Sequence, residues 1–293
     1  MMIKTHWTRA LREFLPEFFD GHPVLSKFYR RAGVVLHGST AMGIDDEFSD
    51  VDLWLLQTEA DLAKLDAASE TRFFEFNLDG KPGHLNATSM GAFSDDLSKC
   101  NMCLIHELRT AAIITDNTGA AAELLALARR TMPDAVRSAF FFYHYVEMRS
   151  YHRACDNPME RRDAVAVLLT AAKCLTHALK AAMALDGEPW PYEKWLHHAA
   201  VKTPTGSALA PGIETILNLL AADKLRFEGP EADNPISREM HGIRRILIDA
   251  ARAKGINEPW LNQWWLHMDQ ARDAVENTRW QEPVGEQAPG TSS

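Results

Sequence analysis

Two short segments, each with polar residues at the edge of an apolar run, constrain this chain more than any other part of its sequence. Residues 34–39 (VVLHGS) form an apolar, β-branched run that ends in Gly-Ser, which predicts a strand breaking into a tight turn. Ten residues follow, enough for one helical turn and an acidic loop. Residues 50–56 (DVDLWLL) then predict a second strand.

Asp50 and Asp52 begin this second strand, and strand geometry decides how they are arranged. Because side chains alternate along a strand, the two carboxylates share one face, while Val51, Leu53 and Leu55 pack on the other. The Cα atoms of the two aspartates are about 6.5–7 Å apart by the strand rise. Like charges at that spacing repel, and a divalent cation is the natural compensation. The pair therefore predicts a site for a hard metal ion.

Gly-Ser on one strand and Asp-x-Asp on the next, at this spacing, resemble the signature of the DNA polymerase β-type nucleotidyltransferase superfamily. An isolated Asp-x-Asp would be explained as well by a loop cap and an exposed strand residue. The resemblance implies that Asp50 and Asp52 are catalytic and hold one or two Mg²⁺ ions beside a bound triphosphate. It also implies that Gly38 lets the backbone approach the phosphates and that Ser39, with nearby amides, holds their oxygens.

The superfamily normally supplies a third carboxylate from a strand next to the Asp-x-Asp strand, and its position is open here. Residues 72–79 (RFFEFNLD) alternate cleanly, and after a tight turn the return strand carries His84, Asn86 and Thr88 on its polar face. The resemblance expects the third acid where Asn86 stands. Glu75 on the outgoing strand is the other candidate, as general base or metal ligand, with an exposed strand residue as the equal alternative.

The periodicity of apolar residues divides the chain into two expected domains. Residues 1–118 are expected to form an α/β nucleotidyltransferase domain with a small mixed sheet, which includes a helix at 59–68 and a closing strand at 111–117. Residues 119–280 are expected to form an α-helical bundle. Its expected helices cover 122–130, 134–155, 161–185, 212–222, 237–254 and 260–280. Residues 281–293, rich in Pro, Gly and Ser, are expected to be a disordered tail.

A segment between two expected helices, residues 187–196 (GEPWPYEKWL), resembles the Pro-Tyr-x-Lys-Trp-Leu segment in the helical domain of aminoglycoside-type nucleotidyltransferases. The resemblance implies that Lys194 contacts the triphosphate and that Tyr192 or Trp190 lines the nucleotide pocket. Two packed tryptophans and a lysine whose stem covers apolar surface explain the segment equally well.

Charge and hydropathy limit the partners of the chain. The net charge of −9 and the pI near 5.7 argue against broad contact with nucleic acid. Arg149 and Arg153, four apart on an expected helix, are more typical of a solvated face than of phosphate binding. No run approaches the roughly 18 apolar residues that span a bilayer, and the N-terminus does not resemble a signal peptide. A cytoplasmic protein without a membrane partner is therefore expected.

Other reactive combinations are sparse. The sequence has no Gly-x-Ser-x-Gly, no Walker loop and no dinucleotide-binding fingerprint. Cys100-x-x-Cys103 has no second close pair to complete a zinc site, so the four cysteines are expected to be buried thiols.

The resemblance thus implies an enzyme that transfers a nucleoside monophosphate, expected to be AMP from ATP, onto a hydroxyl of a small molecule, as antibiotic-modifying nucleotidyltransferases of the aminoglycoside and lincosamide type do. Another nucleoside triphosphate is an alternative substrate. A non-catalytic nucleotide sensor or antitoxin-like protein is the alternative from a different class, and Asn86 in place of an acid supports it. A nucleotidyltransferase that acts on nucleic acid is a third alternative, which the acidic charge balance disfavours.

Overall fold

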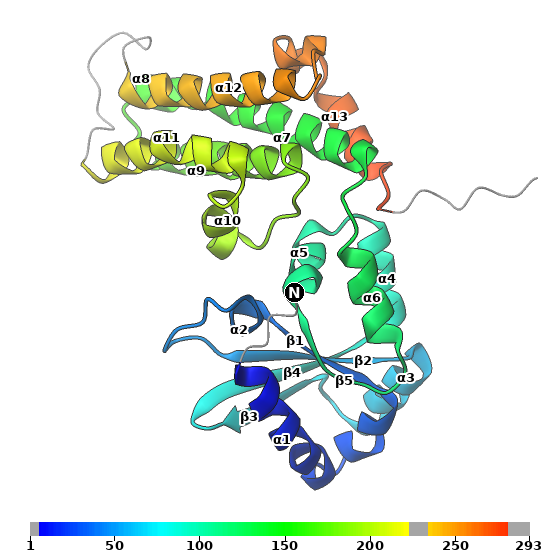
Figure 1. Cartoon of the computed structure of the whole chain (residues 1–293). Helices are drawn as coiled ribbons and strands as arrows, with labels where there is room; N and C mark the ends of the chain where they lie inside the picture. Colours follow the sequence, from blue (N-terminus) through cyan, green and yellow to red (C-terminus); the bar gives the residue numbers. More distant parts are fainter. Residues whose placement is uncertain (1–5, 223–233, 281–293) are drawn as a thin grey trace, which may run out of the picture. The chain divides into compact units, whose positions relative to one another are not determined.

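A mixed sheet of five strands, in the order β3-β4-β2-β1-β5, organises the first part of the chain in a computed structural model that describes residues 6–222 and 234–280 (Figure 1). The strands are β1 Gly33–His37, β2 Val51–Gln57, β3 Phe73–Leu78, β4 Lys81–Ser89 and β5 Ala112–Asp116. The pairing of β2 with β4 is parallel, and the other pairings are antiparallel. All five strands were predicted from the sequence and are confirmed.

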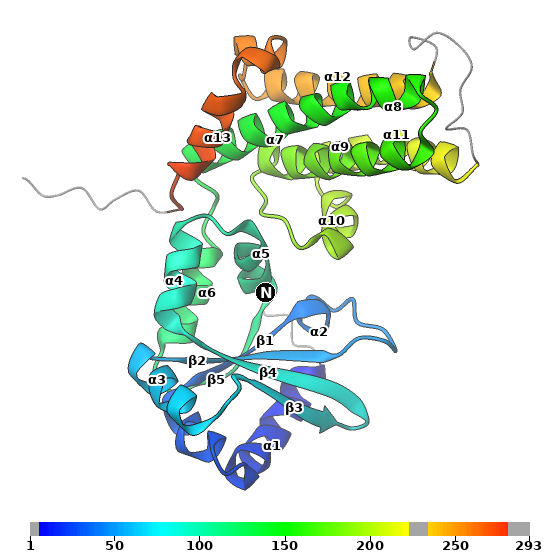
Figure 2. The ribbon, with the colours of Figure 1, turned by 180° about the vertical axis from the view of Figure 1, so that it is seen from behind.

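Helices cover both faces of this sheet (Figures 1 and 2). On one face, α1 (His6–Gly21) buries Leu11, Leu15 and Phe19 in a core shared with the apolar side of the strands. On the other face, α4 (Met90–Ser98), α5 (Met102–Thr110) and α6 (Ala120–Ala128) pack together and against the strands. A short helix, α2 (Gly38–Met42), follows β1, and α3 (Glu59–Ala68) has the bounds that its sequence predicts.

The α4–α5 pair is the element of this unit that the sequence analysis missed. Both helices begin at side-chain caps, because Ser89 accepts a hydrogen bond from the Ala92 amide and Asn101 accepts one from the Leu104 amide. These caps were visible as sequence signals. The helices are only nine residues each, which is too short for apolar periodicity to be decisive.

The chain divides into an α/β unit, residues 1–130, and a helical unit, residues 131–293. The expected boundary at 118 assigned the first helix after the sheet to the helical domain. In the structure that helix, α6, packs against β1, β5 and α5, and therefore belongs to the α/β unit. The expected disordered tail, 281–293, lies outside the described residues.

The helical unit is built on two long helices that pack along each other, α7 (Asp134–Ala154) and α9 (Ala164–Leu185). The other α-helices that the structure describes in this unit are α8 Asp156–Glu160, α10 Glu193–Ala200, α11 Pro204–Ala221, α12 Pro235–Ala253 and α13 Met268–Glu276. The fold is thus an α/β sheet unit followed by a helical unit, as the sequence predicted. α9 is long and apolar enough to cross a membrane by length and composition, but a core helix passes the same test, and α9 packs against α7, α10, α11 and α12.

Two helix predictions in this unit were wrong in extent. The helix expected at 212–222 begins eight residues earlier, at Pro204, because Thr203 caps it and proline suits the first turn. The helix expected at 260–280 is broken into two 3₁₀ turns followed by α13. There the Tyr145 hydroxyl donates to the Leu261 carbonyl at 2.6 Å, so a tertiary contact satisfies that carbonyl. Trp260 packs on the rings of Phe141 and Phe142.

A buried and a partly buried histidine predict that the helical unit loses stability in mild acid. His144 and His177 face each other with their Nδ1 atoms 2.9 Å apart. Burial lowers the pKa of His177 to about 4 and lowers the pKa of His144 well below its ordinary value. The unfolded chain therefore binds protons below pH about 6.5 that the folded chain does not. The free energy of unfolding should fall with decreasing pH by about 1.4 kcal/mol per unit for each such histidine.

Urea unfolding at pH 7 and pH 5.5 measures this slope, and His177→Gln should reduce it. His197, which is exposed on α10, supplies the matched control. A His197→Gln variant should keep the wild-type slope. Equal unfolding free energies of the wild-type protein at the two pH values would contradict the prediction.

Candidate metal centre and nucleotide site

The turn after β1 comes close to the second aspartate of the Asp-x-Asp pair. Gly38 has φ +74°, in the left-handed region that glycine favours, and begins α2. A Cβ atom on Gly38 would lie 2.9 Å from Oδ2 of Asp52, closer than a real Cβ approaches. Glycine is therefore required here for its conformation and for its lack of a side chain. Ser39, the next residue, is 8% exposed, and its predicted role in phosphate binding stays a prediction.

Asp50, Asp52 and His84 form the one cluster of potential metal ligands found among the described residues. One ligand atom from each lies within 4.8 Å of the other two. The Nδ1 atom of His84 is 3.0 Å from Oδ2 of Asp50 and 3.7 Å from Oδ1 of Asp52. All three side chains are partly exposed, so an ion could enter from solvent. Two carboxylates and an imidazole are a donor set that fits a divalent metal ion.

Strand register explains why His84, rather than Asn86, completes the cluster. In the parallel pairing of β2 with β4, Asp52 lies beside His84, and Asn86 lies beside Trp54, further along the strands. The expectation that Asn86 occupies the position next to the aspartates was therefore wrong. The sequence had placed His84 on the correct polar face, but alternation does not give the register between two strands.

Glu75 lies on the next strand, directly opposite His84 in the antiparallel pairing of β3 with β4. Asp52, His84 and Glu75 therefore form one row across three strands, and side chains in such a row point to the same face. The Cα atoms of Glu75 and Asp52 are about 9.5 Å apart by two strand spacings. Glu75 is exposed and is not a member of the metal-ligand cluster. Its role as general base stays a prediction.

The loop that leads into Asp50 is held by a contact between three distant segments. The indole of Trp7 donates to Oδ2 of Asp45 at 3.0 Å, and the ammonium of Lys81 lies 3.3 Å from the same oxygen. Lys81 also donates to the Asp46 carbonyl at 3.0 Å. Burial alone would raise the pKa of Asp45, but the hydrogen bonds from Trp7 and Lys81 outweigh it and lower the pKa. This network fixes the approach of the chain to the metal-ligand cluster.

The inner part of the same sheet face is largely buried and aromatic. His37 pairs with Asp52 across the strands, and its ring stacks on Trp54 with centroids 3.7 Å apart and an interplanar angle of 9°. Burial lowers the pKa of His37 to about 3. Its Nδ1 atom is 3.8 Å from a carboxylate oxygen of Glu107, within the range of an ion pair, but a neutral imidazole makes none. The open end of the face therefore carries Asp50 and Asp52, and the closed end carries the stacked rings of His37 and Trp54.

The residues predicted in the segment 187–196 belong to the helical unit. Trp190 is 4% exposed and packs edge-on against Phe140 and His144, so it is a core residue of the helical unit. Tyr192 is 51% exposed, and Lys194 lies exposed on α10. Nucleotide binding by Tyr192 and Lys194 stays a prediction.

The cysteines take no part in this site. Three of them are buried and Cys103 is partly buried, and no disulfide joins any two of the four. Burial raises the pKa of the Cys155 thiol to about 11 and raises that of Cys174 further. Thiols in such surroundings are unreactive, which agrees with the expected structural role.

Comparison with known proteins gives distant likenesses in fold only. No protein-family model matches the sequence, and no curated protein matches it either. Among solved structures, a nucleotidyltransferase-like protein from Exiguobacterium sibiricum is similar to 91% of this chain, over 81% of its own length. The two share 13% sequence identity with a TM-score of 0.46. A likeness this distant does not establish an activity.

Proposed function

We propose that this chain is a divalent-metal-dependent nucleotidyltransferase that moves a nucleoside monophosphate, AMP from ATP, onto a hydroxyl of a small molecule. The observation that carries the proposal is the convergence of Asp50, Asp52 and His84 beside the Gly38 turn. The Gly-Ser turn and the Asp-x-Asp pair, which are the two parts of the sequence signature, therefore lie together at one end of the sheet. In the same row, Glu75 supplies a carboxylate for an acceptor.

The metal is proposed to be Mg²⁺, as one or two ions, held by Asp50 and Asp52. When bound, it supplies charge neutralisation to the triphosphate and to the leaving pyrophosphate. Mg²⁺ prefers oxygen ligands, whereas imidazole suits softer divalent ions better. The His84 nitrogen should therefore shift the metal preference of this site toward Mn²⁺, compared with a site made of three carboxylates. Mn²⁺ should accordingly support activity.

The reaction proposed for this site is an in-line displacement. The acceptor oxygen bonds to the α-phosphorus, the bond from that phosphorus to the bridging oxygen breaks, and pyrophosphate leaves. Glu75 accepts the hydroxyl proton of the acceptor. The lack of a side chain at Gly38 keeps the turn against Asp52 open to a phosphate group, and Ser39 and the amides of that turn donate to phosphate oxygens. Tyr192 and Lys194 are proposed to add contacts to the nucleotide.

A direct test is the release of pyrophosphate from ATP with Mg²⁺ or Mn²⁺, across a panel of small hydroxyl compounds that includes aminoglycosides and lincosamides. The net charge of −9 makes cationic acceptors the first choice. Transfer of label from α-labelled ATP to one acceptor would support the proposal. ATP binding without transfer to any acceptor would favour the alternative, a nucleotide sensor or antitoxin-like protein located, like the enzyme, in the cytoplasm.

Replacing Glu75 tests its role in proton transfer. Glu75→Gln should retain ATP affinity and lower turnover by about 10²–10⁴-fold, because loss of a general base affects the chemical step and spares ground-state binding. Asp79→Asn, just beyond the end of the same strand, is the control and should keep turnover within about twofold, as a distant surface change does. Equal turnover of Glu75→Gln and wild type would remove Glu75 from the site.

A further inference from the structure

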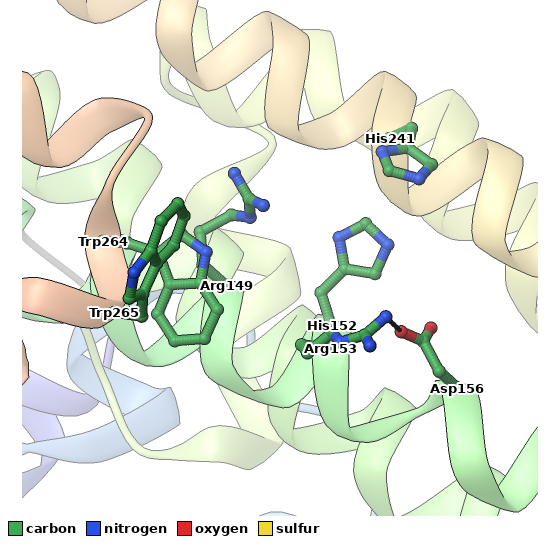
Figure 3. A pocket seen from close by; sticks show the side chains of 7 residues that line it. All are labelled: Arg149, His152, Arg153, Asp156, His241, Trp264 and Trp265. Carbon is green, nitrogen blue, oxygen red and sulfur yellow. Dashed lines mark hydrogen bonds and ion pairs between the residues drawn. The ribbon is translucent and has the colours of Figure 1, made fainter.

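A cavity of about 560 Å³ lies within the helical unit and shares no residue with the metal-ligand cluster (Figure 3). Its lining side chains come from α7, α8, α12 and the 3₁₀ turn Trp264–Leu266. Figure 3 shows Arg149 between the two tryptophans on one side and the histidines His152 and His241 on the other. The volume is that of a pocket for a small organic molecule.

Arg149 brings a partly buried positive charge to the lining. Its Nε and Nη1 atoms are buried and have no hydrogen-bond partner among the described residues. Buried donors of this kind are unfavourable unless a partner satisfies them. The guanidinium lies 5.8 Å from the ring centroid of Trp264, which is a cation–π distance, and it also interacts with the Tyr145 side chain.

Asp156, the acidic residue in the lining, does not balance the positive charge of Arg149. Asp156 is already engaged by Arg153, at 2.5 Å. Burial lowers the pKa of His152 to about 3, so this imidazole is neutral and adds no charge. Burial lowers the pKa of Arg149, the Tyr145 side chain opposes this shift, and the charge of Arg244 on α12 adds to the lowering. The pocket thus holds surplus positive charge, and a guanidinium in its lining matches a carboxylate or phosphate.

Two tryptophans give the pocket an aromatic side. Trp265 is 56% exposed and Trp264 is half-buried, with their rings perpendicular and their centroids 6.1 Å apart. Exposed tryptophan surface next to a polar cavity is typical of a binding site, and a flat ring stacks well on it.

From these contacts we propose that the helical unit binds an organic anion in which a phosphate or carboxylate group is attached to a flat ring. Arg149 holds the anionic oxygens, and Trp264 and Trp265 contact the ring. Binding here needs neither a metal ion nor the transfer reaction, so it stands independently of the proposed function.

Isothermal titration of the full chain in EDTA tests the proposal with four probes: phenyl phosphate, benzoate, inorganic phosphate and benzyl alcohol. Phenyl phosphate or benzoate should bind more tightly than inorganic phosphate and benzyl alcohol. Inorganic phosphate has the anionic group but no ring, and benzyl alcohol has the ring but no anionic group. The tighter of the two aryl anions identifies the preferred anionic group. Arg149→Met should weaken aryl-anion binding by about 10-fold or more, because charge-assisted hydrogen bonds are lost.

Arg245→Met, at an exposed arginine of α12, is the matched control and should leave the affinity unchanged. Should Arg149→Met fail to fold, Trp265→Ala gives the second test, since an exposed side chain contributes little to folding. The Trp265→Ala variant should bind phenyl phosphate about fivefold more weakly than the wild type and should bind inorganic phosphate with unchanged affinity. No binding of either aryl anion at about 10 mM would overturn the proposal, as would equal affinity for benzyl alcohol or full binding by the Arg149→Met variant.

Discussion

Asp52→Asn is expected to lower metal-dependent ATP affinity by about 10²-fold or more and to abolish nucleotidyl transfer, because a charged ligand contributes several kcal/mol at such a site. The asparagine keeps the size of the side chain and removes the charge. Asp52 is partly exposed and close to Asp50, so losing its charge also relieves repulsion in the metal-free protein. The thermal midpoint without metal should therefore stay unchanged or rise.

Calorimetric titration of ATP with and without Mn²⁺ measures this effect, with circular dichroism to verify the fold. Asp95→Asn is the matched control, since Asp95 is an exposed aspartate of α4 paired with Lys99. That variant should bind ATP as the wild type does. If Asp52→Asn retains wild-type affinity in Mn²⁺, Asp52 is not a metal ligand.

Gly38→Ala is expected to damage the site nearly as severely through a single methyl group. The new Cβ would meet Oδ2 of Asp52 at 2.9 Å, so that carboxylate must move away from the ligand cluster. The positive φ of Gly38 adds backbone strain of about 1–3 kcal/mol. We expect metal-dependent ATP affinity to fall by about tenfold or more, since the ligand geometry is lost. Gly38→Val should reduce it further, because a larger side chain also excludes the phosphates.

Gly43→Ala separates strain from contact. Gly43 ends α2 with φ +68°, close to that of Gly38, but a Cβ there meets nothing within 4 Å. Both variants should therefore lose stability by similar amounts, measured by urea unfolding, while only Gly38→Ala loses nucleotide affinity. Equal affinity loss in the two variants would show that backbone strain alone explains the effect.

The sequence predicted much of the sheet, because strand alternation and turn residues are local signals. Asp50 and Asp52 converge as their spacing indicates, and Val51, Leu53 and Leu55 lie in the core behind them. His84 was not recognised as a ligand because its position beside Asp52 follows from the register of β2 and β4. Register is set by contacts between segments far apart in the chain, which periodicity does not contain.

The helical unit shows the same distinction between local and tertiary information. The long helices α7 and α9 follow from sustained apolar periodicity, although Leu168 of α9 is 47% exposed. The stretch after residue 259 breaks into 3₁₀ turns where Tyr145 and the rings around Trp260 engage the backbone and side chains. Those contacts override helix propensity, and that same break places Trp264 and Trp265 beside the cavity.

The central claim, that the Asp50–Asp52–His84 cluster holds a metal ion joined to a triphosphate, is tested most directly by pulsed electron paramagnetic resonance of Mn²⁺ with ATP and the full chain. The claim predicts a coupling from an imidazole nitrogen together with couplings from phosphorus. The nitrogen coupling should vanish in the His84→Gln variant. In the double variant Asp50→Asn, Asp52→Asn, the nitrogen and phosphorus couplings should both be those of free Mn²⁺–ATP. Phosphorus coupling without nitrogen coupling, identical in wild type and double variant, would contradict the claim.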